Sequence, residues 1–169
     1  MDPLEREAIE LAHGAFDAAR RGEVAVVEQA LTLGLPIDAR NGRGDTLLML
    51  AAYYGHVALV QTLLARGASP EVANDAGQTP LAGAAFKGLD EVARALLEGG
   101  ADPNTTMRDG RTALFFAAMF DRLALVERLL AAGASPALRD HGGLTAADAA
   151  RAFGASRTAA RLDALDAAA

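Results

Sequence analysis

The sequence contains no cysteine, and this absence removes several kinds of chemistry at once. Disulfide bonds, thiolate catalysis and zinc sites built on cysteine are all excluded. Hydrophobic residues make up 51% of the chain, but no apolar run reaches the roughly 18 residues that indicate a membrane-spanning helix. We therefore expect no transmembrane segment and no membrane partner.

Positive charge is also in short supply. The chain has 16 Lys and Arg residues against 22 Asp and Glu residues, which gives a net charge of −6. A general nucleic-acid-binding protein carries a basic stripe and a high pI, so this class of function is disfavoured. The first residues are acidic rather than basic, so we expect no secretory signal and a cytoplasmic protein. The basic residues are all arginine apart from Lys87, and alanine is abundant, which is typical of a GC-rich bacterial genome.

The residue patterns of enzymes and metal sites are missing as well. His13, His56 and His141 lie far apart, without the His-x-x-x-His spacing of a metal site. No serine lies in a Gly-x-Ser-x-Gly elbow. The stretch 42–44 lacks the trailing glycine and the strand-to-helix setting of a phosphate-binding loop. We therefore expect a protein that is not an enzyme, with no catalytic residue, no metal and no cofactor.

One strong regularity is present, a period of 33 residues. A glycine recurs at this period, and a threonine follows each glycine by two residues: Gly44, Gly77, Gly110 and Gly143, with Thr46, Thr79, Thr112 and Thr145. A fixed period of this length predicts a protein of stacked repeats. Glycine permits a tight turn at positive φ, threonine caps a helix N-terminus, and proline, as at Pro80, suits the first helical position. Each unit should therefore contain a turn that leads into a short helix.

A second helix is predicted in each unit. A leucine pair such as Leu96-Leu97 recurs at the same period and is followed closely by a glycine such as Gly100, where the helix should end. In the first helix, Leu81, Ala84 and Ala85 have the i, i+3, i+4 spacing of a buried face. Small alanine side chains let consecutive helix pairs approach to roughly 8 to 10 Å.

These motifs resemble the ankyrin repeat. The residues 79–85 follow its Thr-Pro-Leu-x-x-Ala-Ala pattern, and residues 96–101 follow its Leu-Leu-x-x-Gly-Ala helix end. The resemblance covers almost the whole chain, although the histidine of the family motif, which usually ties adjacent turns together, is replaced by Met49, Ala82, Phe115 and Asp148. It implies an all-α solenoid of about five stacked helix-turn-helix units, including caps, with β-turn finger loops.

The period divides the chain into units of a single domain, residues 1–169. We expect an N-terminal capping repeat at 1–40, regular repeats at 41–73, 74–106 and 107–139, and a C-terminal capping repeat at 140–169. In the first unit Leu11 stands where the turn glycine should be, so a helix should run from about Pro3 toward Arg20, with Asp2 as its N-cap and Gly14 as a candidate break.

Two later departures from the pattern carry expectations of their own. Asp121 stands where the other units have a glycine between the helices, and aspartate tolerates positive φ better than most residues. In the last unit Arg151, Thr158 and Asp163 replace apolar residues, which predicts a polar outer face for a terminal repeat.

The strongest functional signal is an aromatic stripe seven and eight residues after each threonine. These positions hold Tyr53 and Tyr54, Phe86 and Lys87, Met119 and Phe120, and Ala152 and Phe153, preceded in the first unit by Arg20 and Arg21. The ankyrin resemblance implies that they lie at the exposed end of the first helix and face a concave groove, where partners bind together with the turn tips. An apolar stripe that faces water is an interaction site. The alternative is that some of these side chains fold onto neighbouring repeats as core, and Phe86 and Met119 are the first we expect to do so.

We therefore predict a non-enzymatic, monomeric protein-interaction module whose partner protein carries acidic and apolar residues. The predicted partner-binding residues are Arg20, Arg21, Arg43, Tyr53, Tyr54, Phe86, Lys87, Arg111, Met119, Phe120 and Phe153. One alternative is an accessory protein of a redox enzyme such as a catalase, because residues 44–53 and 74–83 resemble a bacterial ankyrin subset of which some members accompany catalases. A second alternative is a small-molecule binder, which would need a closed pocket of a kind that an open solenoid seldom offers.

Overall fold

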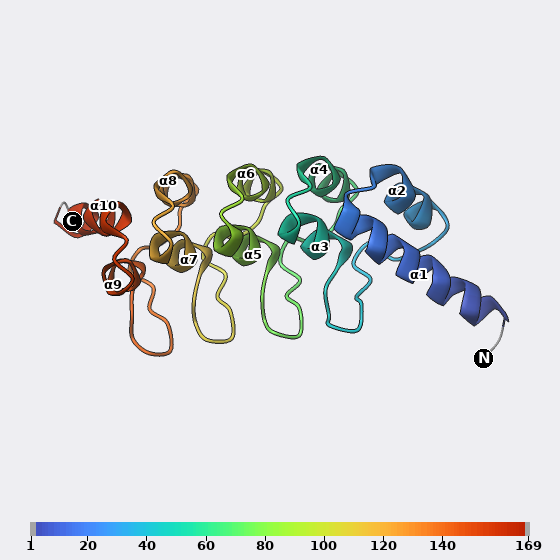
Figure 1. The fold of residues 1–169 in the computed structure, drawn as a ribbon, viewed down its shortest axis with the longest axis horizontal. Coiled ribbons are helices and arrows are strands. Elements are labelled where there is room, and N and C mark those ends of the chain that lie inside the picture. Colours follow the sequence, from blue (N-terminus) through green and yellow to red (C-terminus); the bar gives the residue numbers. More distant parts are fainter. Residues whose placement is uncertain (1–2, 168–169) are drawn as a thin grey trace.

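The computed structural model describes residues 3–167, and over this range the chain forms ten helices arranged as five antiparallel pairs in a row (Figure 1). The even-numbered helices form one layer, the odd-numbered helices form the next, and long finger loops that join the pairs hang from the other side. The all-α solenoid that the sequence predicts is therefore confirmed. The helices are α1 (Pro3–Arg21), α2 (Val24–Thr32), α3 (Leu47–Tyr53), α4 (Val57–Ala65), α5 (Pro80–Lys87), α6 (Asp90–Glu98), α7 (Ala113–Met119), α8 (Leu123–Ala131), α9 (Ala146–Ala152) and α10 (Ser156–Asp166).

The predicted threonine caps begin four of the odd-numbered helices. At α5 the hydroxyl of Thr79 accepts a hydrogen bond from the backbone N–H of Ala82, and Pro80 occupies the first turn. The turn glycine Gly77 has φ of +79°, a conformation that an L side chain rarely adopts. Thr46, Thr112 and Thr145 cap α3, α7 and α9 in the same way.

Alanine forms the buried face between successive odd-numbered helices. Ala51, Ala84 and Ala117 are 0% exposed and recur at the 33-residue period. The core between the two helical layers is built on the first leucine of each pair, because Leu63, Leu96 and Leu129 are also 0% exposed. The second leucine of each pair is only half-buried, so the two leucines of a pair are not equivalent.

Side chains other than the missing family histidine supply hydrogen bonds between repeats. Asp38 accepts from the backbone N–H of Ser69 at 3.0 Å, and Glu71 accepts from the backbone N–H of Asp102 at 2.8 Å. One period later, Asn104 accepts from the backbone N–H of Ser135 at 2.7 Å. Each of these acceptors therefore holds the loop of the helix pair that follows it.

The first helix corrects one expectation. α1 continues through Gly14 without a break. Glycine lowers helix propensity but does not by itself end a helix. The proposed N-cap Asp2 lies outside the described residues. Within the described range no helix, α1 included, is both long enough and apolar enough to cross a membrane.

The structure of the last helix pair, α9 and α10, differs from a second expectation. Thr158 is fully buried rather than exposed on a polar outer face, and its hydroxyl donates to the carbonyl oxygen of Ala118 at 2.7 Å. The prediction for this residue was wrong because a hydroxyl can occupy an apolar position when a backbone acceptor lies within reach. Arg151 and Asp163, in contrast, are exposed and form an ion pair with each other.

Asp121 adopts the left-handed conformation that glycine adopts elsewhere, with φ of +56°. Its carboxylate accepts from the backbone N–H groups of Arg157 and Thr158, each at 3.1 Å, and binds the Arg157 guanidinium at 2.8 Å. The hydrogen bond from Arg157 is the main cause of a lowered pKa of Asp121. The carboxylate thus holds the start of α10, which offsets the backbone strain at this link.

The unequal leucine burial leads to a stability prediction. Replacing Leu96 with alanine leaves a cavity at the centre of the stack and should lower the free energy of unfolding by about 2 to 5 kcal/mol. Leu165→Ala is the matched control, because Leu165 is only half-buried at the end of the stack and should cost much less. Urea titration followed by circular dichroism measures both, and equal losses at the two sites would contradict the stacked core.

A second prediction concerns acid. Hydrogen bonds from the backbone and hydroxyl of Thr145, and then from Arg151, lower the pKa of Asp148 from 3.8 to about 2. Because the folded state has the lower pKa, this contribution to stability is present above pH 3.8 and is lost as the pH falls through about 2. The variant Asp148→Asn should be less stable at neutral pH by about 1 kcal/mol, as for other lost caps. The difference should narrow in urea titrations between pH 4 and pH 2, and a constant difference would refute the assignment.

Candidate partner-binding groove

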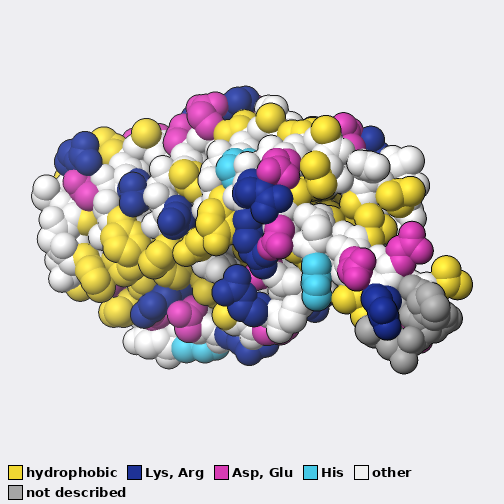
Figure 2. Space-filling view, turned by 45° about the vertical axis from the view of Figure 1, so that its right-hand side comes forward, with side chains coloured by type: hydrophobic (Ala, Val, Ile, Leu, Met, Phe, Trp, Pro, Cys, Tyr) yellow, Lys and Arg dark blue, Asp and Glu magenta, His cyan; other side chains and the backbone are white. Residues whose placement is uncertain are grey.

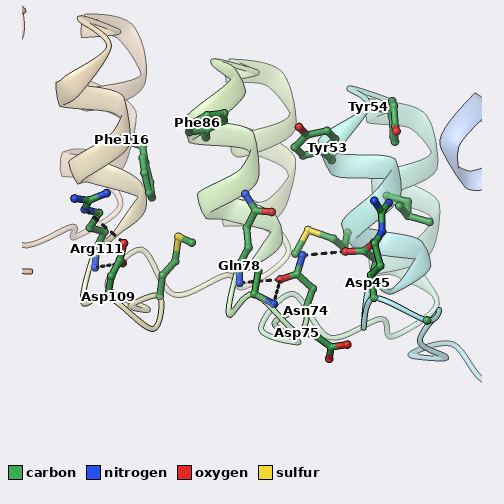
Figure 3. Close-up of a pocket in the computed structure, with 16 residues that line it drawn as sticks. Asp45, Tyr53, Tyr54, Asn74, Asp75, Gln78, Phe86, Asp109, Arg111 and Phe116 are labelled. Atoms are coloured by element: carbon green, nitrogen blue, oxygen red, sulfur yellow. Dashed lines mark hydrogen bonds and ion pairs between the residues drawn. The ribbon is translucent and has the colours of Figure 1, made fainter. Parts of the chain in front are cut away.

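A groove of about 860 Å³, open to solvent, runs between the helices α3, α5 and α7 and the finger loops beneath them. Figure 3 shows aromatic side chains along the helices on one side and polar side chains on the finger loops on the other. The labelled aromatic residues are Tyr53, Tyr54, Phe86 and Phe116, and the labelled polar residues are Asp45, Asn74, Asp75, Gln78, Asp109 and Arg111.

The aromatic rings pack edge to face in two groups. The ring of Phe86 lies 5.8 Å from that of Phe116 and 5.4 Å from that of Phe120, measured between centroids. Tyr53 and Tyr54 form a second pair at 5.5 Å. These contacts fix the ring orientations, because edge-to-face pairs are favoured by the ring quadrupole. The groove thus presents an ordered apolar wall.

Much of this wall is exposed. Tyr54 is 50% exposed, Phe86 is 42% exposed and Phe120 is 40% exposed. Phe86 contacts the next repeat but is not a core residue, so the expectation that it would fold into the core was wrong. Its ring makes T-shaped contacts with Phe116 and Phe120 and still keeps 42% of its surface exposed. Met119 is half-buried and packs against the core, as the alternative interpretation expected.

Asparagines hold the polar finger loops in place. Asn74 accepts from the backbone N–H groups of Ala76 and Gln78 and donates to Asp45 of the preceding finger at 2.9 Å. Asn41 is its equivalent in that preceding finger, and its amide donates to the other carboxylate oxygen of Asp45 at 3.2 Å. The buried Asp45 is therefore bound from two fingers, and this side of the groove is preorganised.

The predicted cations of the first unit are already paired. Arg20 binds Asp17 within α1. Arg21 forms two hydrogen bonds with Glu23, at 2.7 and 3.1 Å, and these bonds lower the pKa of the Glu23 carboxyl. Arg20 lines a second, smaller hollow of about 450 Å³ beside α1, which adjoins the groove at residues 42–43.

The predicted cations of the finger loops are paired too. Arg43 lies 3.4 Å from Asp45, and Arg111 lies 3.4 Å from the buried carboxylate of Asp140. The Arg111 guanidinium also lies 5.0 Å from the ring centroid of Phe115. Hydrogen bonds, first from the backbone of Leu144 and then from Arg111, lower the pKa of Asp140. Both arginines line the groove, but their charge is largely neutralised.

The structure thus brings together a subset of the predicted residues. Arg43, Tyr53, Tyr54, Phe86 and Arg111 line the groove, and Phe120 joins them through its contact with Phe86. Lys87 reaches back over the ring of Tyr53 at 4.9 Å. Phe153 is 66% exposed in the last helix pair and does not line the groove.

Sequence reasoning missed Phe116, which is 7% exposed and lies at the back of the groove. The 33-residue register held the signal, because Leu50 and Gly83 are its equivalents. Gly83 leaves space beside Tyr53, whose ring lies 3.8 Å from the position of an added methyl group, and Phe116 fills its own site with a ring. The three equivalent positions thus present side chains of very different size to the groove.

His56 makes a structural contact between units. The Nε2 atom of His56 lies 2.7 Å from the backbone oxygen of Arg20, so this ring ties the second unit to the first. Across residues 3–167 we find no group of three or more His, Asp or Glu side chains placed to hold a metal ion.

The surface around the groove is mixed in character. Figure 2 shows hydrophobic side chains gathered left of the centre of this view, with separate Lys and Arg side chains among and beside them. Acidic, basic and further hydrophobic side chains are interspersed over the rest of the same face.

Comparisons with known proteins agree with this architecture. The family model "Ankyrin repeats (3 copies)" matches residues 15–107, and the model "Ankyrin repeat" matches residues 109–141. A protein of Pseudomonas aeruginosa that is itself named for ankyrin repeats is 49% identical over 51 residues, which cover 30% of this chain and 30% of that protein. Ankyrin repeats generally mediate protein–protein interactions and are typically non-enzymatic. The family models together match most of the described helices, and the chain therefore belongs to the ankyrin repeat family.

Proposed function

We propose that this chain binds a partner protein reversibly through the groove formed by α3, α5, α7 and their finger loops. One observation carries the proposal: aromatic rings stay 40 to 50% exposed along an open groove of about 860 Å³. Large exposed apolar areas on a soluble protein mark interaction sites. The exposed rings of Tyr54, Phe86 and Phe120 lie outside the alanine and leucine core, so packing of the core does not account for them.

The wall has the properties of a binding hot spot. Aromatic residues dominate the energetics of interfaces because each buries a large area with few rotatable bonds. The edge-to-face contacts of Phe86 with Phe116 and Phe120 hold the rings in position before a partner arrives. Less conformational entropy is then lost on binding, which raises affinity.

The finger loops favour selectivity over affinity. Arg43 and Arg111 lie opposite the rings, and each is held near a buried carboxylate. A partner group that binds there meets a dipolar surface rather than a free charge, so it must match both signs. We propose a partner segment, extended or helical, that places apolar side chains on the rings and polar groups on the fingers.

The accessory role for a redox enzyme such as a catalase is the same proposal with one partner named. The groove carries no feature that selects this partner over other proteins. The small-molecule alternative fits the groove less well, because ligand pockets usually enclose about 70 to 90% of a ligand's surface. The groove is instead open to solvent along the repeats.

The proposal predicts that the rings contribute to binding more than to folding. In the double variant Tyr54→Ala, Phe120→Ala, loss of the edge contacts with Tyr53 and Phe86 should cost about 1 to 2 kcal/mol of stability in total. An aromatic hot spot supplies about 2 kcal/mol or more of binding energy per residue, so affinity should fall at least about 30-fold for each ring that contacts the partner. The measurement is fluorescence anisotropy with peptides selected on the wild-type protein from a random phage library, alongside urea titration.

Leu33→Ala is the matched control. Leu33 is 64% exposed at the end of α2, away from the groove, so its removal takes away apolar surface without touching the rings. Peptide affinity should be unchanged in this variant. Selected peptides that bind the double variant as tightly as the wild type would refute the groove, and a large loss of stability in the double variant would make the rings core residues.

A further inference from the structure

Two cations beside the aromatic wall have no acidic partner. Every other predicted groove cation forms an ion pair, but among residues 3–167 neither Lys87 nor Arg122 lies within ion-pair distance of a carboxylate. Arg122 was absent from the sequence prediction. Both cations instead lie near aromatic rings, Lys87 at 4.9 Å from the centroid of Tyr53 and Arg122 at 5.9 Å from that of Phe120.

Both cations are placed by the C-terminal end of α5. Lys87 is the last residue of this helix, and Gly88 follows it with φ of +74°. The Arg122 guanidinium lies directly against Gly88, because an added methyl group there would stand 2.0 Å from a guanidinium nitrogen. The partial negative charge of the helix end stabilises both cations but does not cancel their charge.

Arg122 is also unsatisfied within the chain. Its Nε atom is buried without a hydrogen-bond partner, and no hydrogen bond joins its Nη atoms to another described residue. The nearest acidic residue in sequence, Asp121, is occupied by Arg157 and by the backbone of Thr158. Asp90, the first residue of α6, is occupied by Arg128, whose guanidinium lies 2.6 Å from its carboxylate. The carboxylates that could have neutralised Arg122 are thus committed elsewhere.

We propose that an acidic side chain of the partner binds between Lys87 and Arg122, next to an apolar side chain that packs on Phe86 and Phe120. This inference rests on the proposed function of the groove and names the chemistry that the groove selects. The motif is an aspartate or glutamate beside a large apolar residue in a protein segment. The planar guanidinium suits a carboxylate because two N–H groups can donate to its two oxygens.

The net charge of the whole chain increases the selectivity for the position of the acidic residue. The net charge is −6, so most of the surface repels an acidic segment. At the aromatic wall, attraction comes from Lys87 and Arg122, and the wall excludes water when it is covered. An ion pair at such a site is less screened than one on an open surface. The acidic residue therefore sets the position of the segment along the groove.

The test uses peptides selected from a random phage library on the wild-type protein. The selected sequences should be enriched in Asp or Glu adjacent to Leu, Ile, Phe or Tyr. The variants Lys87→Gln and Arg122→Gln should each raise Kd about three- to tenfold, in line with single charge-assisted contacts. The effect should shrink when NaCl rises from about 0.1 M to about 1 M, which shortens the Debye length from about 10 Å to about 3 Å. Replacing the peptide's acidic residue with its amide should remove the effect of both variants.

Arg6→Gln is the matched control, since Arg6 is exposed on α1 and the substitution removes the same charge far from α5. Its Kd should change less than about twofold, as expected for a distant screened charge. Circular dichroism melts confirm that each variant is folded. Peptides that lose affinity in the Tyr54→Ala, Phe120→Ala variant but not in the two glutamine variants would overturn this inference and leave the groove in place. Peptides indifferent to all four substitutions, or a selection that yields none, would overturn both proposals.

Discussion

The close approach of the odd-numbered helices is the constraint on which the rest of the molecule depends. Ala51, Ala84 and Ala117 have no exposed surface and put only a methyl group between neighbouring helices. A larger side chain there would push successive units apart. This spacing brings the ring of Phe86 within 5.4 Å of Phe120, one unit further on. The same spacing places adjacent fingers so that Asn74 reaches Asp45.

The sequence predicts the periodic elements of this structure well, because periodic positions share one environment. The threonine caps and the left-handed glycines follow from the chemistry of single residues in a fixed register. Even the exception at Asp121 could be assigned, since aspartate is one of the few residues that tolerates positive φ. The 33-residue register, however, identifies equivalent positions but does not predict the direction of a long side chain.

This limit explains why the prediction for Thr158 was wrong and why the pairing of the groove cations was not predicted. Thr158 occupies an apolar position because a carbonyl oxygen of the preceding unit lies within reach, and no local pattern reveals that acceptor. The arginines of the predicted groove turn toward carboxylates of their own or the next unit, as Arg111 does toward Asp140. Counting charges along the sequence could not show that Lys87 and Arg122, beside the aromatic wall, lack a carboxylate partner among the described residues. Side-chain pairing across units is a property of three-dimensional packing, and it decides where charge is available to a partner.

The acceptors at Asp38, Glu71 and Asn104 also bear on how such a chain can change its length in evolution. The units 41–73 and 74–106 each carry an acceptor that binds the unit after them and donate a backbone hydrogen bond to the unit before them. A duplicated block of 33 residues inserted in the interior would therefore supply both the side-chain acceptor for the next unit and the backbone N–H donor for the preceding one. The equivalent position after Asn104 is Ala137, which offers no side-chain acceptor. Growth by internal duplication is thus favoured over growth beyond this point, and each added unit would extend the groove by one more set of rings and fingers.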